Sequence, residues 1–184
     1  MSDDQISVSE ASKLFKISYS AMFLRSKNKR FNYPSLQYTP DHHPYFNAKE
    51  IYKRAEQECK FLSEHVHLQY VSKVCFGKTY YLSKLYKQGK LNFLDVHIQN
   101  SQPYIEQKQF KDFFTRVCEG RQLIPLVQIK NHLCLPIHKL LDYFSMTDFD
   151  KVPFIKFSEN GRKFYRQSDL NKYFKANNIP LLRA

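Results

Sequence analysis

The sequence predicts an α+β protein, mainly helical, in which a unit of about 60 residues occurs three times in tandem. Two helix patterns separated by a turn recur three times along the 184 residues. A hairpin pattern and a closing helix follow each pair. We expect the units to span residues 1–62, 63–120 and 121–184. The alternative is a single α+β domain in which helices and strands merely alternate.

Each unit opens with a short amphipathic helix. Apolar residues recur three positions apart, as in Val8 with Ala11 and Leu68 with Val71. This spacing places them on one face of a helix. The expected first helices cover residues 8–18, 68–78 and 126–136.

A break and a second helical stretch follow each first helix. Ser18 or Ser20 is the expected cap in the first copy. In the second copy Gly77 allows a tight turn and Thr79 is the expected cap, while Pro136 fits a first helical turn in the third. The expected second helices cover residues 18–29, 79–90 and 136–144, with apolar anchors at Ala21 and Leu24, Leu82 and Leu85, and Leu140 and Tyr143.

A β-hairpin comes next in every copy. In the third, Asn160-Gly161 lies between two runs rich in aromatic residues, which predicts a type I′ turn with positive φ at both central residues. The second copy turns at Asn100-Ser101, and the first has a longer turn at residues 40–44. The expected closing helices cover residues 51–62, 110–118 and 170–176.

The order helix, turn, helix, hairpin, helix resembles the winged helix-turn-helix domains of the MerR and phage-excisionase group. The resemblance is carried by loose apolar patterns, which in the first copy are Val8, Ala11, Leu14 and Phe15 together with Tyr45-Phe46 and Glu50-Ile51. It implies three tandem winged helix-turn-helix modules. In such domains the second helix enters the major groove and the hairpin, the wing, contacts phosphates or the minor groove. The long dimerising helix and the cysteine effector site of MerR regulators have no counterpart here, so sensing of effectors in their manner is not expected.

Net charge favours a polyanionic partner. Lys and Arg number 29 against 17 Asp and Glu, a formal +12, and a field of this sign attracts polyanions. Nucleic acid is the commonest of these. The modules divide the charge as +3, +3 and +6, from 10 basic and 7 acidic, 8 and 5, and 11 and 5 residues. We therefore expect double-stranded DNA as the partner.

Candidate DNA contacts are cationic and small polar side chains on the second helices and on the third hairpin, where the fold requires them. Asp142, on the expected second helix of the third copy, would repel phosphate. The third module is therefore expected to bind DNA through its wing or to use its helix for a protein partner. The candidates are Tyr19, Ser20, Arg25, Lys27, Lys29 and Arg30 in the first copy, Thr79, Tyr80, Tyr81, Ser83, Lys84, Lys87 and Lys90 in the second, and His138, Lys139, Lys156, Arg162, Lys163 and Arg166 in the third.

The 29 Tyr and Phe residues could stack on unpaired bases, as in single-strand binding proteins. We expect most of them in the core instead, because domains this small fill their interiors with large side chains. The expected core aromatics include Phe15, Phe46, Tyr104, Phe110, Phe113, Phe154 and Tyr173.

Other chemistry has little support in the sequence. The four cysteines show no zinc spacing, and the pairs His42-His43 and His65-x-His67 lack further ligands, so no metal or cofactor is expected. No phosphate-binding loop or catalytic motif is present, so the protein is not expected to be an enzyme. The acidic start and the lack of a long apolar run predict a cytoplasmic, nucleoid-associated protein without a membrane partner.

These observations predict a DNA-binding transcriptional regulator. Two alternatives remain open. One is an excisionase-like architectural or replication factor of a phage or plasmid, and the other is a protein-binding adaptor built from winged-helix modules. The oligomeric state, the target sequence and any ligand are not predicted.

Overall fold

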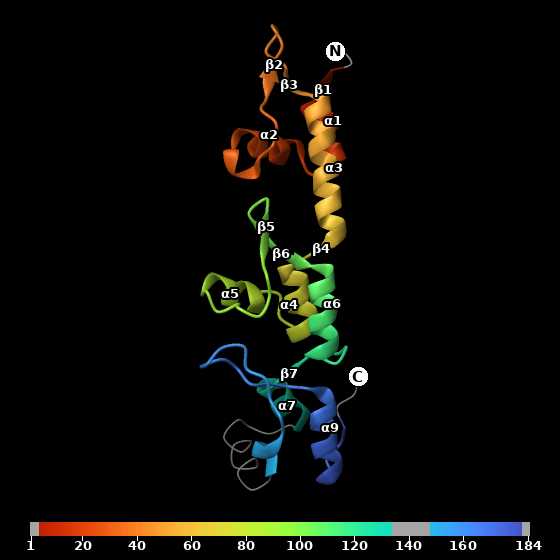
Figure 1. Cartoon of the computed structure of the whole chain (residues 1–184), viewed down its shortest axis with the longest axis vertical. Helices are drawn as coiled ribbons and strands as arrows, with labels where there is room; N and C mark the ends of the chain where they lie inside the picture. The colour runs from red at the N-terminus through yellow and green to blue at the C-terminus, as the bar shows by residue number, and fades with distance from the viewer. Residues whose placement is uncertain (1–3, 134–147, 182–184) are drawn as a thin grey trace. The chain divides into compact units, whose positions relative to one another are not determined.

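The computed structural model describes residues 4–133 and 148–181. In this part the protein is α+β and roughly half helical, with eight α-helices and small antiparallel sheets, which confirms the expected class. The chain divides into two compact units, one of residues 1–66 with 96–104 and one of residues 67–95 with 105–184. Figure 1 labels the helices and strands. The three module boundaries expected from the sequence stay a prediction.

The first unit contains the first expected helix pair, hairpin and closing helix. Ser7 forms a capping box with Glu10 at the start of α1. Ser18, one of the two expected caps, caps α2 by accepting the Ala21 N–H at 3.2 Å. The strands form an antiparallel sheet in the order β1-β3-β2. The elements are β1 (Gln5–Ser7), α1 (Val8–Leu14), α2 (Tyr19–Lys27), the 3-10 turn η1 (Lys29–Phe31), β2 (Gln37–Tyr38), β3 (Pro44–Asn47) and α3 (Ala48–Glu64).

The core of the first unit contains side chains of β1, α1, α2, β3 and α3, among them Val8, Met22, Phe46 and Ile51. Leu24 is 66% exposed, so its expected role as an anchor of the second helix was wrong. Met22 is fully buried in its place. Helix α2 is therefore rotated relative to the expectation, and an aliphatic residue at its surface was mistaken for a core residue.

The second hairpin belongs in part to the first unit and turns where the sequence predicts. Strand β5 (His97–Gln99) pairs with β6 (Gln102–Glu106), in a sheet of order β4-β6-β5 that also contains β4 (His65–His67). Asn100 and Ser101 have φ values of 50° and 61°. Positive φ at both residues of a two-residue loop defines a type I′ turn, so this hairpin is confirmed.

The second unit contains the second helix pair and the described part of the third repeat. Gly77 ends α4 with φ +64°, a left-handed conformation that glycine adopts at least cost, and the Gln122 amide lies where a Cβ would be. The elements are α4 (Leu68–Phe76), α5 (Tyr81–Lys87), α6 (Gln107–Arg116), β7 (Ile124–Pro125), α7 (Leu126–Leu133), the 3-10 turn η2 (Asp148–Lys151), β8 (Phe164–Tyr165) and α9 (Gln167–Ala176). Strand β7 pairs with β8.

The cap of α5 differs from the expectation. Thr79 does not cap the helix. The hydroxyl of buried Ser72, on the preceding helix, accepts the Leu82 N–H at 3.2 Å and donates to the Lys78 carbonyl. A side chain distant in sequence therefore supplies the contact that a local cap would make.

Aromatic side chains fill much of the second unit. Phe76 lies 5.0 Å from Phe157 and 5.1 Å from Phe164, measured between ring centroids, and Tyr81 lies 5.1 Å from Phe164. The expectation that Phe154 is a core residue was wrong, since it is 42% exposed. At this surface position its ring contacts the ammonium groups of two lysines, described below.

The third hairpin turns one step earlier than predicted. The Gly161 N–H donates to the Ser158 carbonyl at 2.8 Å, so Glu159 and Asn160 are the central residues of the turn. Neither Asn160 nor Gly161 has positive φ, and the predicted type I′ turn was wrong. Gly161 occupies the fourth position, where a Cβ would approach the Ser158 carbonyl to 2.8 Å. Close backbone approach, and not positive φ, explains the glycine.

Among the described residues, no helix is both long and apolar enough to span a membrane.

Candidate nucleic-acid interface

The candidate side chains on α2 form two groups. Lys27, Lys29 and Arg30 are exposed, as are Tyr19 and Ser20. Tyr19 stacks on Phe23 at a centroid distance of 6.3 Å, and the Lys27 Nζ lies 4.3 Å from the same ring. Arg25 is half-buried, and its environment is different.

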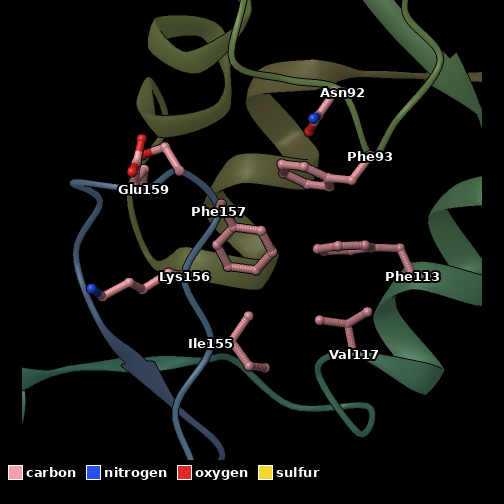
Figure 2. Close-up of a pocket in the computed structure, with 9 residues that line it drawn as sticks. Asn92, Phe93, Phe113, Val117, Ile155, Lys156, Phe157 and Glu159 are labelled. Atoms are coloured by element: carbon pink, nitrogen blue, oxygen red, sulfur yellow. The ribbon is translucent and has the colours of Figure 1, made fainter.

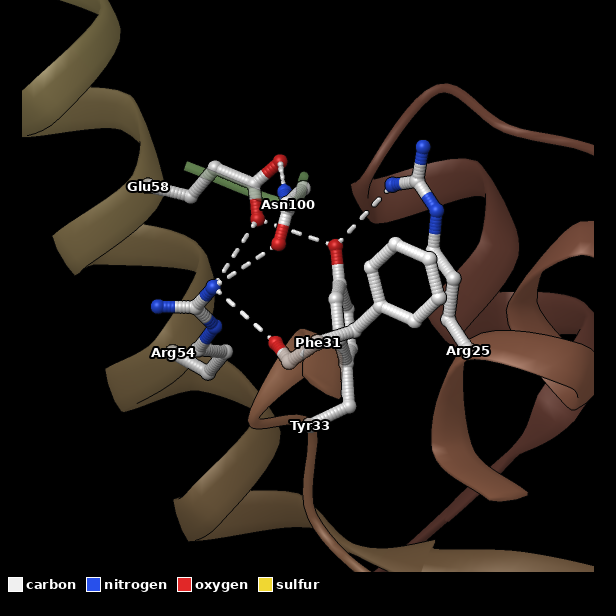
Figure 3. A network of polar contacts seen from close by, with 6 residues as sticks. All are labelled: Arg25, Phe31, Tyr33, Arg54, Glu58 and Asn100. Carbon is white, nitrogen blue, oxygen red and sulfur yellow. Dashed lines mark hydrogen bonds and ion pairs between the residues drawn. The ribbon is translucent and has the colours of Figure 1, made fainter. Parts of the chain in front are cut away.

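Arg25 is part of a polar network that ties α2 to α3 (Figure 3). Its Nη1 donates to the Tyr33 hydroxyl at 3.2 Å, and that hydroxyl donates to Glu58 at 2.9 Å. The guanidinium also lies over the Phe31 and Tyr33 rings, 5.8 and 5.9 Å from their centroids. Burial, and then the charge of Glu58, raises the pKa of Tyr33 above its usual value. Arg25 therefore stabilises the unit as well as offering positive charge.

The hairpin turn at Asn100 completes this network within the first unit. Asn100 donates to Glu58 at 3.0 Å and accepts from Arg54 at 3.2 Å. Arg54 also lies 3.8 Å from Glu58, and both side chains are almost buried, at 13% and 14% exposure. The expected wing of the second copy is thus held at its turn by contacts with α3, which leaves the turn's amide group committed to the protein.

The second unit brings α5 and the third hairpin together. Residues of the segment 78–90, around α5, and four residues of the third hairpin, Ser158 and Asn160 to Arg162 but not Glu159, line one open pocket of about 480 Å³. Tyr80 at its edge is 70% exposed. Burial raises the pKa of Tyr81 above its usual value, and the positive charge of Arg162 opposes this. The lining residues are Lys78, Thr79, Tyr80, Tyr81, Lys84, Leu85, Gln88, Lys90, Ser158, Asn160, Gly161 and Arg162.

Charge in this pocket has one sign. Among the described residues that line it, the charged ones are Lys78, Lys84, Lys90 and Arg162, and none is a carboxylate. We call these four residues the basic cluster. Six of the candidates predicted from the second and third copies line this pocket, namely Thr79, Tyr80, Tyr81, Lys84, Lys90 and Arg162. Lys87 is exposed on the same helix outside the lining, and the Ser83 hydroxyl is buried.

Apolar side chains of the third hairpin pack against the α6 region and hold the hairpin in place (Figure 2). Ile155 and Phe157 point toward Phe113 and Val117 of the α6 region, whereas Lys156 points away from them. The Phe157 and Phe93 rings are 4.9 Å apart. These side chains line a second open pocket, of about 610 Å³. Side chains alternate along residues 155–157, so that Ile155 and Phe157 are partly buried toward α6 while Lys156 is exposed.

The remaining cations of the third hairpin have distinct surroundings. The ammonium groups of Lys156 and Lys163 lie 5.8 and 4.4 Å from the centroid of exposed Phe154. Arg166 pairs with Glu119 at 3.2 Å and donates to the carbonyls of Val117 and Arg116. These partners already neutralise the charge of Arg166, which favours a structural role for it. His138 and Lys139 lie outside the described residues.

Sequence reasoning missed two features of this surface. Lys78 was not a candidate because it lies in the turn before α5, although its position beside Thr79 could have indicated it. Phe154 was assigned to the core because it lies at an apolar-periodic position and small domains fill their interiors with large side chains. In the sequence only Lys156, two positions along the chain, indicated this environment, because Lys163 is nine positions away.

Comparison with known proteins gives no further guide, since no family model, curated protein or solved structure matches the chain.

Proposed function

We propose that the protein is a non-enzymatic double-stranded DNA-binding protein that acts as a transcriptional regulator. In this proposal its repeats are winged helix-turn-helix modules, with α2 and α5 in the major groove and the third hairpin as a wing on phosphate. DNA binding would place the protein at the nucleoid.

The observation that carries the proposal is the basic cluster. Three lysines around α5 and Arg162 of the hairpin come from segments about 80 residues apart, yet they line one pocket whose described lining residues include no carboxylate. A solvated surface would gain nothing from gathering like charges, because they repel one another. Phosphate groups would offset that repulsion, and the lysines and the arginine would release the counterions condensed on the DNA.

The hairpin's packing supports a role as a wing. The contacts of Ile155 and Phe157 fix the backbone, so a phosphate meets Arg162 and Lys163 without a large ordering cost. These two side chains are exposed. A cation held in place in this way positions a duplex without reading its sequence.

The test is the salt dependence of binding to a short labelled duplex, followed by fluorescence anisotropy. The slope of log K against log salt should be steep, and Lys84→Ala with Lys87→Ala should flatten it by about one unit for each lost phosphate contact. The matched control replaces Lys108 and Lys111, two exposed lysines of α6, by Ala. Equal slopes for the α5 variant, the α6 variant and the parent would contradict the proposal.

The two alternatives give different results in the same system. An architectural factor would bend the duplex strongly without changing promoter activity. A protein-binding adaptor would not be retained on DNA at about 0.15 M salt.

A further inference from the structure

The pocket between α5 and the third hairpin has a composition that a phosphate-contacting surface does not need. Beside the basic cluster it is lined by two tyrosines and Leu85. Tyr80 has 70% of its surface exposed, although an aromatic side chain gains free energy by burial. An exposed ring next to several cations is the combination found in proteins that bind unpaired nucleotides.

The size of the pocket limits what can enter. Its volume of about 480 Å³ lies in the range of small-molecule sites. A duplex is far too wide for it, whereas one nucleotide of similar volume fits. The cations would contact the phosphate while the base stacks on the ring of Tyr80.

A second observation points to a polar ligand in the same place. The Tyr81 hydroxyl oxygen is buried, and among the described residues it makes no hydrogen bond. A buried hydroxyl without a partner costs free energy. Tyr81 lines the pocket, so a polar atom of a bound molecule would supply the missing partner once the side chains that cover the hydroxyl move aside.

We propose that this pocket binds a single unpaired nucleotide of DNA, with the base stacked on Tyr80, a polar atom near Tyr81 and the phosphate among the basic cluster. This inference rests on the proposed function and makes it more specific. It implies that the protein prefers duplexes that contain an unpaired nucleotide, because a paired base must first leave the stack at a cost of a few kcal/mol.

The experiment compares two labelled duplexes of the same sequence. One is fully paired, and the other carries one extra, unpaired 2-aminopurine nucleotide on one strand. Anisotropy gives the two affinities, and 2-aminopurine fluorescence reports stacking. The parent should bind the bulged duplex about tenfold more tightly, with quenching of the 2-aminopurine.

Variants test the role of the ring. Tyr80→Ala should reduce the ratio of the two affinities to about one, and Tyr80→Phe should keep it near tenfold, because stacking needs the ring alone. The matched control is Tyr70→Ala, which removes a tyrosine that is 56% exposed on α4 and outside the pocket lining. That variant should retain the parent's ratio.

Free nucleotides share the proposed chemistry, so a second arm separates the two sources. Displacement of the 2-aminopurine by free dAMP would assign the pocket to mononucleotides as well. Persistent quenching with excess dAMP would assign it to unpaired nucleotides within a strand.

The outcomes separate this inference from the proposed function. Equal affinities for the two duplexes, with no effect of dAMP, would overturn the inference and leave duplex binding intact. No binding to either duplex would overturn both. A preference for the bulge that Tyr80→Ala does not change would show that another part of the surface holds the nucleotide and would also overturn the inference.

Discussion

Glu58→Gln should destabilise the protein substantially, although it changes only the charge of one side chain. Glu58 accepts hydrogen bonds from Tyr33 and Asn100 at 2.9 and 3.0 Å and lies 3.8 Å from Arg54. A glutamine of the same shape would retain one acceptor oxygen, present an NH2 group toward one of the donors and leave Arg54 without its counter-ion.

The magnitude follows from the burial of this network. Removing one partner of a fully buried ion pair costs about 3–5 kcal/mol. Arg54 keeps its contact with Asn100, and Arg54 and Glu58 keep 13% and 14% exposure. We therefore expect a loss of about 2–3 kcal/mol in the free energy of unfolding.

Urea unfolding followed by circular dichroism measures this loss, which should lower the midpoint by about 1 M. Glu56→Gln on the same helix is the matched control, because Glu56 is exposed and its substitution should change stability by less than about 0.5 kcal/mol. Equal midpoints for the two variants would refute the inference that the network stabilises the first unit.

Three further predictions concern the second unit. Arg162→Ala with Lys163→Ala should lower affinity for all duplexes about equally and leave the preferred sequence unchanged, because wing cations contact phosphate. A binding selection with the variant checks this, and an altered preferred sequence would contradict it. Gly161→Val should weaken DNA binding by displacing the hairpin turn, because its Cβ would approach the Ser158 carbonyl to 2.8 Å; parent-like affinity would show that the turn tolerates the change. Burial, and then the charge of Asp150, raises the pKa of Tyr165 to about 12, above its ordinary value of 10.0. Because the folded state holds the Tyr165 proton more tightly, the protonated hydroxyl stabilises the fold fully below about pH 10, and this contribution is lost between about pH 10 and 12. The free energy of unfolding should fall by about 2–3 kcal/mol over this range. Tyr165→Phe should lack this change when urea midpoints are compared across the same pH range.

Local signals in the sequence predicted the elements well. Eight of the nine expected helices are present, as α1, α2, α3, α4, α5, α6, α7 and α9, and the ninth, expected at residues 136–144, lies outside the described residues. The serine cap at Ser18, the left-handed Gly77 and the turn at Asn100-Ser101 depend only on neighbouring residues. Such features can be deduced because their physical cause lies within a few positions of the chain.

Features that depend on distant residues were not predictable. Ser72 caps α5 from another helix, and strands β1, β4 and β7 are too short to show a period. The type I′ turn at Asn160-Gly161 was predicted from a dipeptide. In the structure the Gly161 N–H donates to the Ser158 carbonyl, so the central residues of the turn are Glu159 and Asn160.

The candidate site was predicted in part. Residue type and position identified the lysines of α5 and Arg162 separately, but no pattern indicated that they line one pocket. Likewise nothing in the sequence distinguished half-buried Arg25, which contacts Tyr33, from exposed Lys27. Tertiary contacts decide which cations remain available to a ligand.

Selection of bound sequences from a random duplex pool, at about 0.15 M salt, tests the central claim of specific duplex DNA binding most directly. The account predicts that the parent protein enriches a defined sequence and that the variant with Lys84 and Lys87 replaced by Ala recovers much less DNA. A bound fraction with the composition of the starting pool, or equal recovery by the parent and that variant, would contradict it.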